Sequence, residues 1–180
     1  MAARAAITID EFELLPAALA ENSELIDGEL VDVSGNTPLH NAIRDFLIAM
    51  LRPVVAKQQL GKIISEQEFD FDGNAHGPDV ALIGADHVAA INPRKRVQRF
   101  VPDLAIEIVS ENDTFTKLMA KASRYRRCGT REVWVVSPDT RQAFVLSADG
   151  QTILEETGML QTKLIPGFSI SVGELIDRAL

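Results

Sequence analysis

The sequence predicts an α/β protein in which helices pack against a central mixed β-sheet. Segments with the apolar spacing of helices alternate with short apolar or alternating segments that are typical of strands. The chain has 180 residues, of which 46% are hydrophobic, enough to build one sizeable core. No internal repeat and no Pro-, Gly- or Ser-rich linker interrupts it, so we expect a single domain over residues 1–180.

The composition argues against several classes of protein. A charged fraction of 24% without low-complexity tracts argues against disorder. The most apolar stretch, residues 46–56, is broken by Arg52 and Pro53 and is shorter than the roughly 20 residues of a membrane span. Acidic residues follow the N-terminus where a signal peptide would have an apolar core. Cys128 is the single cysteine, which excludes an internal disulfide and a cysteine-based metal site. We therefore expect a soluble, cytoplasmic protein with no membrane partner.

The first part of the chain predicts a short helix and a hairpin. Thr8 and Glu11 have the spacing of a capping box, which predicts a helix over about residues 9–19. The step Asp27-Gly28 between alternating apolar residues predicts a hairpin over residues 24–33.

A long helix follows the hairpin. Its start is indicated by a cap at Asn36 or Thr37 and by Pro38 in the first turn, and its apolar spacing continues to about Gln59. Pro53 predicts a kink or a division of this helix.

The rest of the chain alternates strands with helices. Residues 101–109 are largely apolar, which is typical of a strand in the centre of a sheet. Asp113 can cap the next helix, and Gly129 can end it in the left-handed conformation. The expected elements after the long helix are strands at 62–71, 78–83, 101–109, 132–136, 141–146 and 151–155, a helix at 114–127 and a C-terminal helix from Val172.

Charge is distributed unevenly along the sequence. The formal net charge is −8, whereas residues 94–131 hold ten Lys or Arg and only four Asp or Glu. Such a basic stretch can bind the phosphates of a nucleic acid, although an acidic net charge is unusual for proteins with that function. The alternative is that both regions are solvated surface, and charge alone does not decide between the two.

Two carboxylates stand inside apolar strands, where charged side chains are rare. Asp79 precedes Val-Ala-Leu-Ile, and Glu107 lies within Leu-Ala-Ile-Glu-Ile-Val. A buried carboxylate must be paired or bound to a cation, because leaving it unpaired costs several kcal/mol. If the two strands are neighbours, Asp79 and Glu107 point to one spot, where their repulsion favours a divalent cation or a shared proton. Oxygen ligands without a cysteine pair favour Mg²⁺ or Mn²⁺ over zinc.

The helix after Glu107 supplies cationic side chains. Lys117, Lys121 and Arg124 lie at i, i+4 and i+7 and form one stripe beside the apolar stripe that docks on the sheet. A lysine at the edge of that interface would reach a water on the cation or an oxygen of a phosphate. The alternative is that Asp79 or Glu107 pairs with a lysine or arginine of this helix as a structural ion pair.

The order of these motifs carries a family resemblance. Pro78-Asp79 in a strand, Glu107 in the next strand and a helix after it are similar to the pattern of PD-(D/E)xK nucleases. More closely, the chain resembles the large bacterial family of putative restriction endonucleases (Uma-type). The matching strings are Glu24-Leu-Ile-Asp-Gly-Glu-Leu30, His40, Pro78-Asp79-Val80, Pro102-Asp103-Leu-Ala-Ile-Glu107-Ile-Val-Ser110, Lys121 with Tyr125, and Arg131-Glu-Val-Trp-Val-Val-Ser-Pro138. The resemblance implies a restriction-endonuclease-like core over about residues 24–146 and a metal-dependent endonuclease that cuts DNA.

By this resemblance, Asp79, Glu107 and Lys121 are the expected catalytic residues. Asp79, Glu107 and the Ile108 carbonyl would hold Mg²⁺ or Mn²⁺. The lysine of the superfamily normally stands two residues after the acid, where this chain has a valine. In such nucleases the lysine can instead lie on the following helix, which makes Lys121 the candidate. Lys117, one turn earlier, competes for the role at a place where the family more often has an acid.

The resemblance adds further candidates. His40 would contact a phosphate or water in the same cleft, or alternatively faces solvent or serves as a cap partner. A second cation would need another acid, for which Glu29 and Asp103 are candidates, and Asp103 is alternatively a surface residue or a cap. A homodimer is expected as well, since enzymes that cut a duplex gain from two-fold symmetry.

Other functions stay open from the sequence. A relative that has kept the fold would bind DNA or protein without cutting it. A two-carboxylate hydrolase acting on sugars would work without a metal ion. A structural module that acts as an oligomer is the last alternative.

Overall fold

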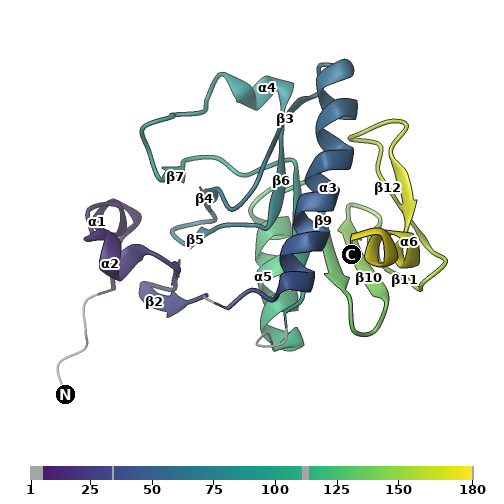
Figure 1. Cartoon of the computed structure of the whole chain (residues 1–180). Helices are drawn as coiled ribbons and strands as arrows, with labels where there is room; N and C mark the ends of the chain where they lie inside the picture. The colour runs from purple at the N-terminus through teal and green to yellow at the C-terminus, as the bar shows by residue number, and fades with distance from the viewer. Residues whose placement is uncertain (1–5, 34, 111–113, 180) are drawn as a thin grey trace.

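A six-stranded sheet forms the centre of the molecule (Figure 1). The computed structural model describes residues 6–33, 35–110 and 114–179. The strand order is β11-β10-β9-β8-β6-β3, in which β8 and β9 are parallel and the other neighbours are antiparallel. The strands are β3 (Gly61–Ile64), β6 (Val80–Gly84), β8 (Leu104–Ile108), β9 (Glu132–Ser137), β10 (Gln142–Ser147) and β11 (Gly150–Leu154). The predicted mixed sheet, with its central strand at β8, is therefore confirmed.

Helices cover both faces of this sheet. α3 (Pro38–Lys57) and α6 (Val172–Ala179) pack on one face, and α5 (Phe115–Arg127) packs on the other. Because side chains alternate along a strand, β8 sends Ile106 into the core beneath α3 and Ala105 into the core beneath α5. This alternation places the odd-numbered residues of β8 on the side of α5.

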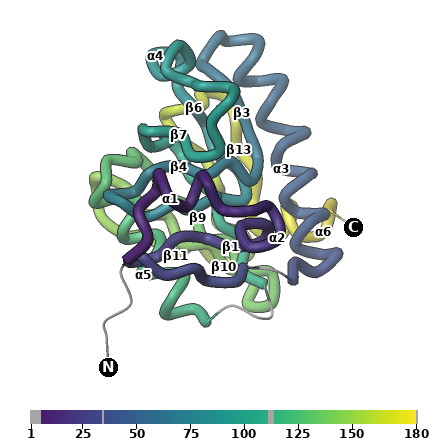
Figure 2. The backbone as a smooth tube through the Cα atoms, turned by 90° about the vertical axis from the view of Figure 1, so that its left-hand side faces the viewer, coloured from purple at the N-terminus to yellow at the C-terminus, as the bar shows by residue number. Residues whose placement is uncertain are grey.

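A second sheet joins the N-terminal hairpin to strands from the middle of the chain. Its order is β2-β1-β5-β4-β7. Figure 2 shows the N-terminal segment, including α1 and α2, crossing the face that is turned toward the viewer. A small separate hydrophobic core, which includes Phe12, Leu25 and Val97, holds this segment in place. The elements are α1 (Ile9–Glu13), α2 (Ala17–Ala20), β1 (Ser23–Ile26), β2 (Glu29–Asp32), β4 (Glu68–Asp70), β5 (Ala75–His76) and β7 (Val97–Gln98).

The hairpin turn forms where the sequence predicted it. β1 and β2 are antiparallel, with Ile26 opposite Glu29. Asp27 and Gly28 both have positive φ, +50° and +79°, as a two-residue turn of type I′ requires. A Cβ added to Gly28 would lie 2.5 Å from the Cβ of Ala6, so both the backbone conformation and the available space call for glycine.

Helix ends follow the predicted signals in most places. The capping box of Thr8 and Glu11 is present, and Thr37 caps α3 through its side chain. α5 ends before Gly129, which has a φ of +111°. The predicted cap Asp113 lies outside the described residues.

Three predicted elements differ from the structure. The helix expected over 9–19 is two short helices, because Pro16 has no N–H to continue the first one. The strand expected over 62–71 is β3 and β4, which belong to different sheets and are separated by Glu66 at a φ of +54°. Pro53 does not divide α3, which is continuous from its first to its last residue.

Several short elements were not predicted. They have two to four residues, too few for a periodic pattern to stand out. They are β5, β7, α4 (Ala85–Val88), β12 (Met159–Gln161) and β13 (Ser169–Ser171). No helix in the described ranges is long and apolar enough to cross a membrane.

The basic loop near residue 96 is paired with acids of the N-terminal half. Arg96 binds both carboxylate oxygens of Glu68 and donates to the carbonyls of Ala20 and Ser23 over 2.7 and 3.2 Å. Its guanidinium also lies 4.3 Å from the ring centre of Phe12. Arg96 therefore holds the fold together, a role that neither the phosphate-binding interpretation nor the solvated-surface alternative predicted.

Arg96→Ala is expected to lower the free energy of unfolding by about 2–3 kcal/mol, because it removes charged hydrogen bonds and leaves the largely buried Glu68 unpaired. Urea unfolding followed by circular dichroism measures this change. Arg94→Ala serves as the control, since Arg94 is exposed in the same loop and should change stability by less than about 0.5 kcal/mol. Equal stability of the two variants would contradict the role given to Arg96.

Candidate active site

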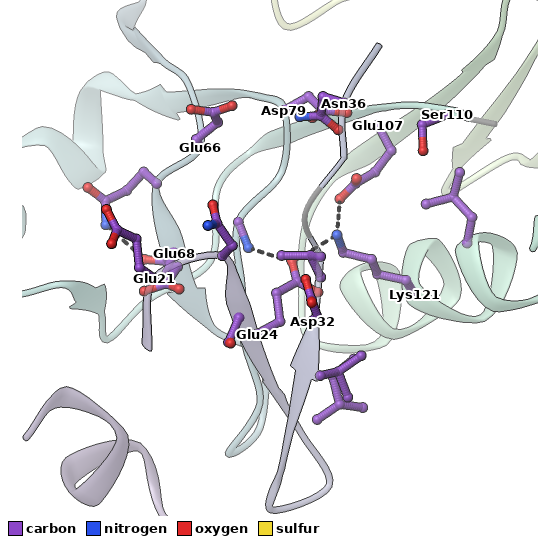
Figure 3. A pocket seen from close by; sticks show the side chains of 18 of the residues that line it. Glu21, Glu24, Asp32, Asn36, Glu66, Glu68, Asp79, Glu107, Ser110 and Lys121 are labelled. Carbon is purple, nitrogen blue, oxygen red and sulfur yellow. Dashed lines mark hydrogen bonds and ion pairs between the residues drawn. The ribbon is translucent and has the colours of Figure 1, made fainter. Parts of the chain in front are cut away.

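A cavity of about 830 Å³ lies where the hairpin, the start of α3 and the first half of α5 approach the carboxyl end of β8. Figure 3 shows Glu107 and Glu24 close to Lys121, with Glu21, Glu66 and Glu68 farther from it in the same cavity. Seven acidic and four basic side chains line the cavity: Glu21, Glu24, Asp32, Glu66, Glu68, Asp79 and Glu107, with Lys95, Arg96, Lys117 and Lys121. This excess of acids repels a phosphate unless a cation is present.

Asp79 stands immediately before β6, and two groups hold its carboxylate. The N–H of Ile108 donates to Asp79 Oδ2 over 2.7 Å, and His40 Nε2 lies 3.1 Å from the same oxygen. β6 and β8 are neighbours, with Val80 opposite Ile106, so the side chain of Asp79 reaches the end of β8.

His40 is 3% exposed and does not face solvent. Burial disfavours its charged form, but the hydrogen bond and charge of Asp79 outweigh burial and raise the pKa of His40 above its ordinary value. The structure thus places His40 in direct contact with the first of the predicted acids.

Glu107 projects from β8 toward α5 and is 4% exposed. The hydroxyl of Tyr125 donates to Glu107 Oε1 over 2.7 Å, and Lys121 Nζ lies 3.0 Å from the same oxygen. Burial raises the pKa of Glu107 to about 8; Lys121 opposes this shift, while the charges of Asp79 and Glu24 add to it. A divalent cation in the cavity would favour the ionised carboxylate again.

Lys121 extends from α5, and its ammonium lies between two carboxylates that come from different sheets. Nζ is 2.9 Å from Glu24 Oε1 and 3.0 Å from Glu107 Oε1. Burial disfavours the ammonium, but these carboxylates outweigh it and hold the pKa of Lys121 well above its ordinary value. Lys117 also lines the cavity, but it is exposed and forms no ion pair within residues 6–33, 35–110 and 114–179.

Glu24 of β1 is the acid that sequence reasoning did not assign to the site. It is 5% exposed; its Oε1 accepts the N–H of Gly77 over 3.0 Å, and its Oε2 lies 2.8 Å from His76 Nδ1. Burial acts to raise the pKa of Glu24, but Lys121 and His76 outweigh it and lower the pKa to about 2. The signal that was available is an acid inside the apolar strand Ser-Glu-Leu-Ile, the same signal that selected the other two acids.

Two other predicted acids lie elsewhere. Glu29 is exposed and does not line the cavity, although Val31 and Asp32 of the same strand, β2, do. Asp103 is 8% exposed and therefore not a surface residue. It stands at the opposite end of β8 from the cavity, where its carboxylate accepts the N–H of Gly84 over 2.8 Å and contacts His87 Nδ1 at 3.1 Å.

The donor set fits a hard divalent cation. Asp79 Oδ1 and Glu107 Oε2 accept no hydrogen bond from the described residues, and Ile108, with its predicted carbonyl ligand, lines the same cavity. In the described part of the chain, no three or more His, Cys, Asp or Glu side chains are grouped to hold a metal ion. Mg²⁺ is commonly held by one or two carboxylates, with water and phosphate oxygens completing its shell. Two carboxylates and a carbonyl are therefore enough protein ligands for Mg²⁺, whose other ligands can be water and phosphate oxygens. They would not be enough for a metal ion that is bound by side chains alone.

Comparison with known families agrees with the motifs. The model of a family named Uma2 and described as "Putative restriction endonuclease" matches residues 9–173 of the chain. The chain belongs to this family. The resemblance seen in the motifs is thereby confirmed, and a search of curated proteins finds no match to this Uma2 chain.

A solved structure shares the fold over almost its whole length. The crystal structure of a putative nuclease belonging to DUF820 from Anabaena variabilis ATCC 29413 matches this Uma2 chain with a TM-score of 0.85 at 23% sequence identity. The match covers 97% of this chain and 99% of that one, and it confirms the predicted fold. A chain of the DrdV–DNA complex matches weakly, with a TM-score of 0.35 at 13% identity over 77% of this chain and 13% of that one, and it supports no conclusion.

Proposed function

We propose that this chain is an endonuclease that hydrolyses phosphodiester bonds of DNA and depends on Mg²⁺ or Mn²⁺. The observation that carries the proposal is the convergence of Asp79, Glu107 and Lys121, which come from the start of β6, from β8 and from α5, in one cavity. Membership of a restriction endonuclease family supports the nuclease class.

Each residue has a role that follows from its contacts. Asp79, Glu107 and the Ile108 carbonyl would hold the cation, and the contact with His40 orients Asp79. When bound, the cation supplies positive charge that offsets the charge of the scissile phosphate and promotes the ionisation of water. Lys121 stays protonated, so it donates a hydrogen bond to a phosphate oxygen or to the nucleophile and does not accept a proton.

The full chain, incubated with supercoiled plasmid, is expected to cut DNA in Mg²⁺ or Mn²⁺ and to lose this activity in EDTA. A cut in one strand leaves a nicked circle, and cuts in both strands, which a two-fold dimer would make, yield a linear product on the same gel. Cleavage that persists in EDTA would show a metal-independent hydrolase and overturn the proposal.

Calorimetric titration with Mn²⁺ separates binding from cutting. We expect one site per chain, which Asp79→Asn removes. Mn²⁺ bound at this site without cleavage of any DNA would identify a relative that has kept the fold and lost the activity, and the proposal of catalysis would then fall.

A further inference from the structure

Glu24 and His76 form a buried pair beside Lys121 that the roles above do not use. We propose that Glu24 is a positioning residue of this site, which holds the Lys121 ammonium against Glu107 and is itself oriented by His76. This inference rests on the proposed function for its effect on catalysis, whereas the placement of the ammonium can be tested without it.

The position of the Lys121 ammonium depends on two carboxylates. Nζ lies 2.9 Å from Glu24 Oε1 and 3.0 Å from Glu107 Oε1, and the lysine side chain is 17% exposed. An ammonium has three N–H donors, and these two contacts leave one donor for a substrate oxygen. Glu24 thus determines the direction in which the remaining donor points.

Glu24 is itself held rigidly. The N–H of Gly77 binds its Oε1 over 3.0 Å, and its Oε2 contacts His76 Nδ1 at 2.8 Å. Since an ionised carboxylate only accepts hydrogen bonds, His76 carries its proton on Nδ1 toward Glu24. β1 pairs with β5 through Leu25 and Ala75, which brings Glu24 and His76 to adjacent positions of the small sheet.

These contacts close a ring of side chains. The ring of His76 packs edge-on against Tyr125, with centroids 5.7 Å apart, and Tyr125 donates to Glu107. Glu107 contacts Lys121, and Lys121 contacts Glu24, which returns to His76. The ring links the N-terminal hairpin to β8 and α5. The small sheet therefore contributes two side chains, Glu24 and His76, to the site.

A free lysine side chain has four rotatable bonds and loses much conformational entropy when it is fixed. Glu24 fixes the side chain of Lys121 before the substrate binds. Removing it would leave the ammonium charged but poorly placed, and misplacement of a catalytic group by about 1 Å costs on the order of 100-fold in rate. The effect of Glu24 therefore has to pass through Lys121.

The experiment is a double-mutant cycle on DNA cleavage in Mg²⁺ with Glu24→Gln and Lys121→Met. Glu24→Gln is expected to lower kcat by about 10- to 100-fold and to change KM by less than about 3-fold. In the Lys121→Met background, Glu24→Gln should cause no further loss, because the group through which it acts is absent. An equal loss in both backgrounds would show that Glu24 serves only the fold.

Asp27→Asn is the matched control. Asp27 lies on the same hairpin, and its exposed carboxylate pairs with Arg124 at 3.1 and 3.2 Å outside the cavity. Asn tolerates the positive φ of this position, so the turn should be kept. We expect its kcat to stay within about 2-fold of the wild-type value.

A second measurement does not depend on activity. A ¹H–¹⁵N spectrum selective for lysine ammonium groups is expected to show a slowly exchanging signal from Lys121, assigned by its absence in Lys121→Met. The signal should disappear in Glu24→Gln and persist in Asp27→Asn. Its persistence in Glu24→Gln would overturn the positioning role, whatever the chain does to DNA. If the wild-type chain cuts no DNA but the signal follows this pattern, the proposed function fails while the placement of Lys121 by Glu24 stands.

Discussion

Asp79→Asn is expected to lower Mg²⁺-dependent DNA cleavage by about 1,000-fold, which corresponds to roughly 4 kcal/mol of transition-state stabilisation. The substitution removes one of the two carboxylates that would hold the cation but keeps an oxygen that can accept the N–H of Ile108. It also removes a negative charge that Glu107 experiences, so the fold should not be weakened. The melting temperature is expected to stay within about 3 °C of the wild-type value.

Asp103→Asn is the control for this result. Asp103 is also a buried carboxylate on the α5 side of the sheet, but it lies at the far end of β8 and binds Gly84 and His87. We expect the opposite pattern, a lower melting temperature with cleavage retained per folded molecule. Quantified plasmid cleavage together with thermal unfolding measures both effects. Full activity of Asp79→Asn would remove Asp79 from the site.

Lys121→Met should reduce cleavage by about 100-fold, whereas Lys117→Met should change it by less than about 3-fold. Both lysines line the cavity from the same helix, one turn apart, but only Lys121 contacts Glu107. Methionine keeps most of the length and apolar contacts of lysine while it removes the charge. The comparison decides which helix lysine acts.

The Lys121 variant should also be less stable, by up to about 3 kcal/mol, because Glu24 and Glu107 lose their shared cation in a buried place. Initial cleavage rates are therefore to be measured well below the melting temperature, with the folded fraction determined by circular dichroism. A larger loss of rate in Lys117→Met than in Lys121→Met would reverse the assignment of the catalytic lysine.

Much of the fold could be predicted because it depends on local patterns. The spacing of apolar residues along α3 and α5, the Asp27-Gly28 turn and the capping box at Thr8 each act over a few residues. The predicted elements were wrong where one apolar pattern is compatible with two different structures. Residues 62–71 read as one strand, yet the chain turns at Glu66 and enters a second sheet, a change that depends on distant partners.

The candidate site was predicted in part for the same reason. Asp79 and Glu107 stood out because a carboxylate inside an apolar strand needs a partner, and strand alternation placed them on one face. Glu29, the sequence's candidate for a second cation, does not line the cavity, since the sequence does not show which residues of the hairpin face it. Glu24, on the inner strand, lines the cavity.

The sequence by itself therefore determined the mixed α/β class, the two strand carboxylates and the lysine stripe on α5, since periodicity and the cost of burying charge are properties of single segments. Tertiary structure alone decided that Lys121 is the lysine that meets Glu107, that His40 contacts Asp79, and that Glu24 and His76 complete the ring. These pairings join residues separated by 14 to 97 positions. Their geometry depends on how the two sheets and α5 pack together, which no local pattern encodes.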